Sequence, residues 1–330
     1  MTGIEWTQET WNPIIGCSIV SSGCTNCYAM KMAVRLEAMG IEHYKGTTKQ
    51  SKGGAVWTGK IALAPDHVLL KPLRWRNPKT IFVNSMGDLF HEDIPDEWID
   101  KVFAVMALCP HHTFQILTKR SARMREYLDA RLDAGEGHLW RWLTQCEINA
   151  RLGFHTSIEH YAIYHTHAPV FPLRNVWLGV SCEDQKRADE RIPDLLATPA
   201  SVRFISAEPL LGEIRLHRLL HCRGCPGCYS LDCGNHGLHW VIVGGESGPS
   251  ARPMHPDWAR SLRDQCVAAS VPFFFKQWGE WADADDYASE VQEHYDVQGL
   301  TSEKSIRVGK RKAGRILDGR KHDDMPQVHI

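Results

Sequence analysis

The chain has 330 residues, of which 43% are hydrophobic and 23% are charged, and its formal net charge at pH 7 is -1. This composition is typical of a folded globular protein and excludes an intrinsically disordered chain. The near-zero net charge also excludes a protein that holds duplex DNA through a broad basic surface, while a local basic patch stays compatible with it.

The N-terminal segment, MTGIEWTQETWNP, lacks the basic and apolar regions of a secretion signal. No run in the chain approaches the roughly 18 consecutive apolar residues of a membrane span. We therefore expect a cytoplasmic protein that makes no membrane contact. In that compartment the eleven cysteines indicate metal, cluster or redox chemistry rather than disulfides.

Three cysteines lie close together near the N-terminus, in the pattern C-x6-C-x2-C formed by Cys17, Cys24 and Cys27. Thiolates are soft ligands that suit iron–sulfur clusters and zinc. Three thiolates on a [4Fe–4S] cluster would leave one iron open to an outside ligand, and the intervening Gly, Ser and Asn residues allow the chain to wrap around it. A zinc site with a histidine or an aspartate as the fourth ligand is the alternative.

Apolar runs alternate with helix-compatible stretches along the rest of the chain. The runs are 60–63, 81–84, 114–118, 176–180, 202–206, 240–243 and 272–275, and the predicted helices include 29–39, 96–108, 185–196 and 256–269. Buried runs of this length are typical of parallel strands, and their alternation with helices predicts an α/β fold with a mainly parallel sheet, either a barrel or an open sheet.

Polar residues follow six of these runs, at the edge where parallel α/β folds place their chemistry. The candidate site residues among them are Ser85, Asp88, Lys119, Ser181, Glu183, Glu208 and Glu246. His91 lies shortly after the run that ends at residue 84, and Cys182 lies between Ser181 and Glu183. Ordinary solvated loops are the alternative interpretation of these positions, and a buried structural thiol is the alternative for Cys182.

Three segments interrupt the alternation. Residues 121–174 predict a helical insertion, residues 213–239 a cysteine-rich insertion, and residues 282–330 a polar C-terminal extension of a domain that spans 1–281. The second insertion holds four cysteines within twelve residues, Cys222, Cys225, Cys228 and Cys233. Four thiolates satisfy a closed tetrahedral zinc site, and an auxiliary iron–sulfur cluster or unligated cysteines are the alternatives.

The motif series carries a resemblance over most of the chain, from residue 11 to about residue 281. Its segments are WNPIIGCSIVSSGCTNCYA, VNSMGDLFHEDIPDEWI, FQILTKR, NVWLGVS, RFISAEPLLG, WVIVGGESGPSARPMHPDWARSLRDQC and PFFFKQWGEW. Together they resemble the phage-associated radical-SAM-like family, with a more distant similarity to spore photoproduct lyase. The resemblance implies a partial (β/α) barrel in which a [4Fe–4S] cluster binds S-adenosylmethionine and one electron cleaves it to a 5′-deoxyadenosyl radical. The cysteine spacing differs from the common C-x3-C-x2-C pattern.

The chemistry of the residues after the strands, together with the strand order, predicts roles for them in binding S-adenosylmethionine. We expect Ser85 and Asp88 to accept the ammonium group of S-adenosylmethionine, and Lys119 or Arg120 to neutralise its carboxylate. Ser181 with Glu183 would meet the ribose hydroxyls, and Glu246 in Gly244-Gly245-Glu246 is a further candidate for cofactor binding.

Substrate chemistry has three candidate residues. Cys182 would return a hydrogen atom, while His91 and Glu208 would contact the substrate or transfer protons. The implied partners are an electron donor such as flavodoxin or ferredoxin and, as one interpretation, a nucleic-acid substrate. The alternative function is a zinc-stabilised nucleic-acid-binding protein without radical chemistry, which would use residues 222–233, the basic tail and tryptophans that stack on bases.

Overall fold

The computed structural model describes residues 4–133, 172–216, 237–287 and 304–327. The four cysteines of the second group and most of the predicted helical insertion lie outside these residues. The described residues comprise the barrel, the N-terminal cysteines and two parts of the C-terminal segment.

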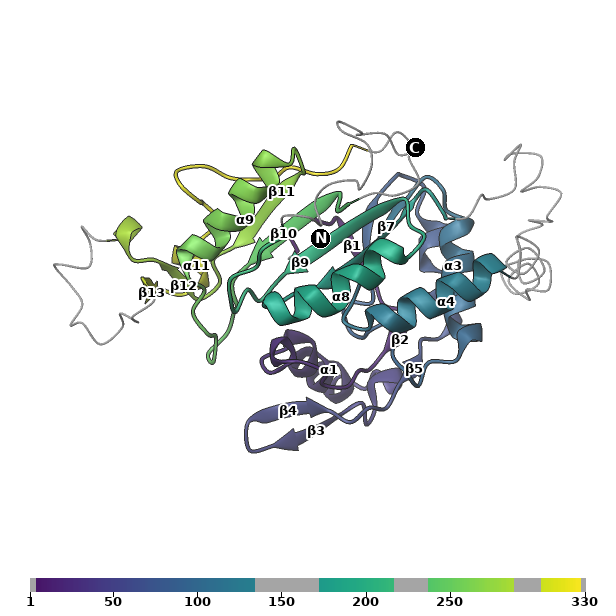
Figure 1. Ribbon diagram of the computed structural model, residues 1–330. Helices are drawn as coiled ribbons and strands as arrows, with labels where there is room; N and C mark the ends of the chain where they lie inside the picture. The colour runs from purple at the N-terminus through teal and green to yellow at the C-terminus, as the bar shows by residue number, and fades with distance from the viewer. Residues whose placement is uncertain (1–3, 134–171, 217–236, 288–303, 328–330) are drawn as a thin grey trace.

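The central element is a sheet of seven strands in the order β1-β6-β7-β8-β9-β10-β11. Its strands are β1 (Glu9–Trp11), β6 (Thr80–Val83), β7 (Thr113–Thr118), β8 (Val176–Ser181), β9 (Val202–Ala207), β10 (Trp240–Gly244) and β11 (Phe273–Gln277). Every neighbouring pair is parallel. The sheet curls into a half-barrel flanked by helices (Figure 1), which confirms the predicted partial (β/α) barrel of mainly parallel strands.

Helices cover one face of this sheet. They are α3 (Asp96–Ala107), α4 (Ser121–Asp133), α8 (Gln185–Ala197) and α9 (Pro256–Ala268), with the short α2 (Asp66–Leu69) and η3 (Lys71–Arg74) beside them. Local signals fix where two of them begin, since Asp184 caps α8 by accepting from the backbone N–H of Arg187, and Pro256 opens α9. Apolar residues of these helices and of the facing strand positions form the largest core of the protein.

Aromatic side chains fill the opposite face of the sheet. Strand residues alternate between the two faces, so Ile81 and Val83 join the helix-side core while Phe82 points the other way. There it packs with Trp6, Trp177, Phe204, Trp240 and Phe274. The three tryptophans of this cluster therefore serve packing within the half-barrel rather than exposed base stacking.

The segment before β6 builds a separate small lobe. It contains β2 (Ile14–Ile15), η1 (Ser22–Cys24), α1 (Tyr28–Ala38), η2 (Glu42–Tyr44), the hairpin of β3 (Thr48–Ser51) and β4 (Gly54–Trp57), and β5 (Ala62–Leu63). The parallel strand predicted at 60–63 is wrong, because β5 pairs with β2 in an antiparallel two-stranded sheet and its side chains are only half-buried. The sheet edge is instead β1, a three-residue strand that the sequence pattern did not predict.

The C-terminal segment returns to the barrel. Its elements are β12 (Trp281–Asp283), η4 (Asp285–Tyr287), β13 (Ser305–Arg307) and α11 (Lys310–Ala313). Leu317 is fully buried, the indole N–H of Trp278 donates to the Ile316 carbonyl at 2.7 Å, and that of Trp240 donates to the Asp324 carbonyl at 2.8 Å. In the described parts of the chain no helix is long and apolar enough to cross a membrane.

Candidate functional site

The candidate site lies where the N-terminal cysteines meet the carboxyl ends of the parallel strands. Residues 16–27, which we call the cysteine loop, connect β2 to α1. Three acidic side chains, each located just after an alternate strand of the sheet, reach this loop directly or through an arginine. They are Asp88 after β6, Glu183 after β8 and Glu246 after β10.

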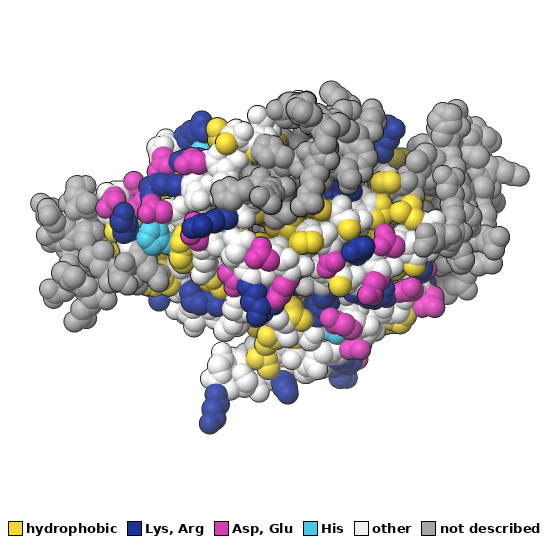
Figure 2. Space-filling view, viewed as in Figure 1, with side chains coloured by type: hydrophobic (Ala, Val, Ile, Leu, Met, Phe, Trp, Pro, Cys, Tyr) yellow, Lys and Arg dark blue, Asp and Glu magenta, His cyan; other side chains and the backbone are white. Residues whose placement is uncertain are grey.

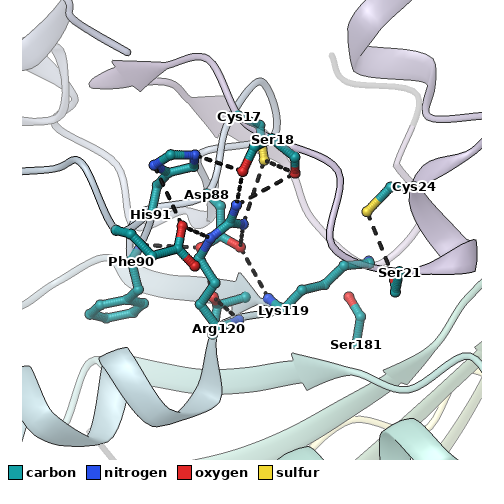
Figure 3. Close-up of polar contacts among 12 residues, drawn as sticks. Cys17, Ser18, Ser21, Cys24, Asp88, Phe90, His91, Lys119, Arg120 and Ser181 are labelled. Atoms are coloured by element: carbon teal, nitrogen blue, oxygen red, sulfur yellow. Dashed lines mark hydrogen bonds and ion pairs between the residues drawn. The ribbon is translucent and has the colours of Figure 1, made fainter. Parts of the chain in front are cut away.

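The first contact is built on Arg120, which follows β7. Its Nη1 donates to Oδ2 of Asp88 at 3.0 Å and to Sγ of Cys17 at 3.6 Å. Asp88 also accepts from the Thr118 hydroxyl at 2.6 Å. Burial would lower the pKa of Arg120, but Asp88 and Glu92, whose Oε2 accepts from Nε of Arg120 at 2.8 Å, raise it, so the guanidinium stays charged. Figure 3 shows the guanidinium between Asp88 and the beginning of the cysteine loop.

Ser18 joins this network from the loop side. The Arg120 Nη2 donates to its Oγ at 2.7 Å, and the Nε2 of His91 lies 2.9 Å from the same oxygen. The backbone N–H of Asp93 donates to Nδ1 of His91 at 3.2 Å, which places the ring proton on Nε2. Burial, together with Arg120, lowers the pKa of His91. The imidazole is therefore neutral near pH 7 and donates to Ser18 rather than acting as its base.

The second contact involves Glu183, which is completely buried. Its Oε1 accepts from the hydroxyl of Ser21, and its Oε2 accepts from Nη1 of Arg191 at 2.9 Å. Burial raises the pKa of Glu183, but Lys119, Arg191 and Ser21 lower it by more, so the net pKa lies below its ordinary value. The side chain is a fixed negative charge beneath the middle of the cysteine loop.

The third contact involves Glu246 and the end of the loop. Asn26, between the second and third cysteines, donates from Nδ2 to Oε2 of Glu246 at 3.0 Å. Arg252 binds both oxygens of the same carboxylate, at 2.9 Å from Nε and 2.6 Å from Nη2, and its Nη2 also donates to the carbonyl of Ser22 at 3.0 Å. Glu246 and Arg252 together hold the segment that carries Cys24 and Cys27.

Two glycines, Gly16 and Gly87, allow the beginning of the cysteine loop to lie against neighbouring backbone. Gly16 has a φ of +101°, and a Cβ there would overlap the carbonyl of Lys60. Gly16 also bridges to Gly87, where a Cβ would lie 2.9 Å from the Gly16 carbonyl. A side chain at Gly16 would push the cysteine loop away from Lys60, and one at Gly87 would push it away from the end of β6.

The three thiols differ in what surrounds them. Burial raises the pKa of Cys17 to about 12, and burial likewise raises the pKa of Cys27. The Asp88 carboxylate raises the pKa of Cys17 further, whereas Arg120 lowers it. Lys119 lowers the pKa of Cys27. Figure 3 shows the Cys17 side chain directed to Arg120 and the Cys24 side chain directed to Ser21. Cys17 and Cys27 are therefore neutral thiols near pH 7, each with a cation nearby.

The donor set fits a cluster in its chemistry, because three thiols share one loop and the charges of Arg120 and Lys119 favour the thiolates of Cys17 and Cys27, respectively. In the described residues no three Cys, His, Asp or Glu side chains already lie together as metal ligands. Binding would therefore require the thiols to lose their protons and to turn toward one another.

The other predicted residues lie around this network or away from it. The hydroxyl of Ser85 donates to Oδ1 of Asn12 at 3.1 Å, and Ser181 is buried at the end of β8. Nζ of Lys119 lies 3.9 Å from Glu183. Glu208 accepts from Nζ of Lys276 at 2.8 Å, on the side of β11.

Cys182 belongs to the hydrophobic core on the helix side of the sheet and is completely buried. Burial raises the pKa of its thiol well above the ordinary range. In this position the thiol packs as a small apolar group, as the alternative interpretation of the sequence predicted.

Several residues of the network were not singled out in the sequence. They are Ser18, Ser21, Asn26, Arg191 and Arg252. The only signal for the first three was their position between the cysteines. The two arginines lie on α8 and in the loop before α9, where single arginines are common and carry no pattern.

Comparison with known protein families gives a match along almost the whole chain. A family model described as "Protein of unknown function (DUF5131)" matches residues 1–326. No curated protein and no solved structure matches the chain.

Proposed function

We propose that this chain, which belongs to the DUF5131 family, is a radical S-adenosylmethionine enzyme whose cluster is held by Cys17, Cys24 and Cys27. The observation that carries the proposal is the anchoring of a three-thiol loop over the carboxyl edge of a parallel half-barrel. Acidic residues after three alternate strands hold that loop. A loop that only joined two elements would not need three charge-assisted connections to buried carboxylates.

The three thiols would hold a [4Fe–4S] cluster with one iron left open. When bound, the cluster with S-adenosylmethionine supplies one-electron cleavage to a 5′-deoxyadenosyl radical. Arg120 and Lys119 place positive charge beside Cys17 and Cys27, which favours their thiolates. His91 keeps Ser18 in place through its Nε2 proton.

The residues predicted to contact the cofactor fall into two groups, according to whether protein donors already occupy them. Asp88, Glu183 and Glu246 are occupied by protein donors, so we assign them to positioning the cysteine loop. Ser85, Lys119 and Ser181 are the candidates for contact with S-adenosylmethionine. The proposal places the enzyme in the cytoplasm with flavodoxin or ferredoxin as electron donor, and it leaves Cys222, Cys225, Cys228 and Cys233 to zinc or an auxiliary cluster.

Anaerobic reconstitution with iron and sulfide tests this proposal. The wild-type chain should bind a [4Fe–4S] cluster and form 5′-deoxyadenosine from S-adenosylmethionine on reduction, while Cys24→Ala should abolish the product. Cys109→Ala, at a buried cysteine after α3, is the matched control and should retain it. A variant that lacks the cysteines at 222, 225, 228 and 233 shows whether the N-terminal cysteines bind the cluster on their own. Zinc without iron, and no 5′-deoxyadenosine, contradicts the proposal and supports the zinc-stabilised nucleic-acid-binding alternative.

A further inference from the structure

Residues 28–60 form a basic lobe in a chain that is otherwise slightly acidic. This stretch, which we call the α1–hairpin lobe, contains six Lys or Arg and two Asp or Glu residues, whereas the whole chain has a net charge of -1. All six cations are exposed: Lys31, Arg35, Lys45, Lys49, Lys52 and Lys60. The structure describes every residue of this lobe, and the only ion pair within it joins Lys45 to Glu42. Its positive charge is therefore mostly uncompensated.

The lobe packs directly against the cysteine loop. Ala33 of α1, Tyr44 of η2 and Trp57 of the hairpin share one core, and Cys17 and Cys27 pack against it. Helix α1 begins directly after Cys27. Nζ of Lys31 lies close to Gly248, in the loop that also carries Glu246. A ligand bound along the lobe would therefore reach the thiols and the carboxyl edge of the sheet.

The surface near the thiols is apolar and aromatic. Tyr28 is 55% exposed and Met32 is 37% exposed, one turn apart on α1. Ile19, 51% exposed, adds to this surface from within the cysteine loop. The hydroxyl of Tyr28 donates to the carbonyl of Ser85 at 3.0 Å, which holds the ring at the edge of the site. An exposed aromatic ring in this position suits stacking with a base.

The hairpin farther from the thiols is polar and cationic. Lys49 lies on β3 and Lys52 in the tight turn between Ser51 and Gly54, and both are exposed. Figure 2 shows Lys and Arg side chains, in dark blue, at the lower end of the molecule, where Figure 1 places the hairpin. Within residues 45–60, all of which the structure describes, no large apolar side chain is exposed. Lysine-rich surfaces without an apolar centre are unlike protein interfaces and are typical of contacts to phosphates.

From these observations we infer that the α1–hairpin lobe binds the sugar-phosphate backbone of a nucleic acid strand and presents one of its nucleotides to the cysteine loop. The hairpin lysines and Arg35 contact phosphates, and Tyr28 stacks on a base. The local patch reconciles a neutral chain with a polyanionic substrate. As the substrate class of the enzyme, this inference rests on the proposed function, while the binding surface itself is tested separately.

The test measures binding by fluorescence anisotropy with the full chain. The probes are labelled single-stranded DNA, single-stranded RNA and duplex DNA of about 20 nucleotides, between about 50 and 200 mM salt. The wild-type chain should bind at least one probe, with an affinity that falls as salt rises. Lys49→Glu/Lys52→Glu should weaken binding at least about ten-fold. It should also flatten the salt dependence, by roughly 0.7 in log–log slope for each phosphate that the variant no longer neutralises.

Lys310→Glu/Arg311→Glu is the matched control, since these exposed cations lie on α11 at the other end of the chain. It should bind as the wild type does. Lys49→Gln/Lys52→Gln tests the same point should the charge reversal unfold the hairpin. Binding that survives the hairpin variants overturns the inference, whether or not the α11 variant binds, and so does a wild-type chain that binds none of the probes.

Formation of 5′-deoxyadenosine without substrate distinguishes this inference from the proposed function. The hairpin variants should retain it, because their lysines lie outside the cysteine loop. If no probe binds while 5′-deoxyadenosine still forms, the inference fails and the proposed function stands. If the probes bind through the hairpin but no 5′-deoxyadenosine forms, the binding surface stands and the proposed function fails.

Discussion

Arg120 and Asp88 form a buried ion pair with an Nη1 to Oδ2 distance of 3.0 Å, and the same guanidinium contacts Sγ of Cys17 and Oγ of Ser18. The pair joins the ends of β6 and β7 to the beginning of the cysteine loop. Because both partners are buried, removing the Asp88 charge leaves Arg120 with one acidic partner, the largely exposed Glu92, whose Oε2 lies 2.8 Å from Nε of Arg120.

Asp88→Asn should therefore lower the free energy of unfolding by about 3 kcal/mol, the low end of the range for a broken buried pair, because Glu92 still compensates part of the arginine's charge. The amide keeps the size of the carboxylate but cannot balance the guanidinium. Urea unfolding followed by circular dichroism measures the change. Glu42→Gln, which removes an exposed pair with Lys45, is the control and should cost less than about 1 kcal/mol. Equal unfolding midpoints for the two variants would contradict a structural role for the buried pair.

Glu183 predicts a pH dependence of stability. Its pKa in the folded chain lies below the ordinary value of 4.5, because Lys119, Arg191 and Ser21 outweigh the effect of burial. A lowered pKa means that the unfolded chain binds the proton first, so the stabilisation is present above pH 4.5 and is lost as the pH falls through the folded pKa.

The variant Glu183→Gln tests this sign. It should be less stable than the wild type at neutral pH, and the difference in the free energy of unfolding should shrink as the pH falls from about 5 to about 3. Urea unfolding at several pH values gives the two curves, and Glu37→Gln, at a half-buried glutamate of α1, provides the matched control. A difference that stays constant over this range would show that the ionised form of Glu183 is not what stabilises the fold.

The third prediction concerns added volume at Gly23, where the cysteine loop lies against Glu183. A Cβ at this position would overlap the Glu183 carboxylate, which Ser21 and Arg191 hold in place. Gly23→Ala should therefore cost about 1 to 3 kcal/mol of stability and reduce the iron bound after reconstitution. Gly53→Ala, where nothing lies within 4 Å of the added carbon, is the control, and both quantities should stay close to those of the wild type. Full iron content in Gly23→Ala would show that cluster binding does not depend on the Glu183 contact.

The fourth prediction concerns Glu246 and how often the end of the cysteine loop opens. Glu246→Ala removes the acceptor of Asn26 and Arg252, so the segment with Cys27 should open more often. In the reduced, metal-free chain, alkylation of Cys27 by iodoacetamide should become about ten-fold faster, as measured by mass spectrometry. Cys266, buried in the core, is the reference within the same sample and should keep its rate. Equal acceleration at both cysteines would indicate global unfolding instead of local opening.

Most of the half-barrel could be predicted from the sequence, because six of its strands are continuous apolar runs and their helices have clear starts. β1 was not predicted, since Glu9–Trp11 is short and only Trp11 is buried. The run at 60–63 was assigned to the parallel sheet but pairs with β2, because a hydrophobic pattern indicates a strand without identifying the strand that it pairs with.

The sequence predicted which strand-end residues lie at the site but not the contacts that they make. The strand-end positions Asp88, Glu183 and Glu246 follow from the parallel fold. Their contacts join positions far apart in the chain: Arg120 and Cys17 are 103 residues apart, Ser21 and Glu183 are 162 apart, and Asn26 and Glu246 are 220 apart. No local pattern carries such pairings, so the use of these carboxylates in holding the cysteine loop emerged only from the structure.

The most direct test of the proposed chemistry is electron paramagnetic resonance of the reconstituted, reduced chain with and without S-adenosylmethionine. The variant used lacks the cysteines at 222, 225, 228 and 233, so that only Cys17, Cys24 and Cys27 can hold a cluster. We predict a [4Fe–4S] signal that changes when S-adenosylmethionine is added and that disappears in the additional Cys24→Ala variant. A signal that does not change when S-adenosylmethionine is added, or the absence of a cluster on the three thiols, would contradict the proposed function.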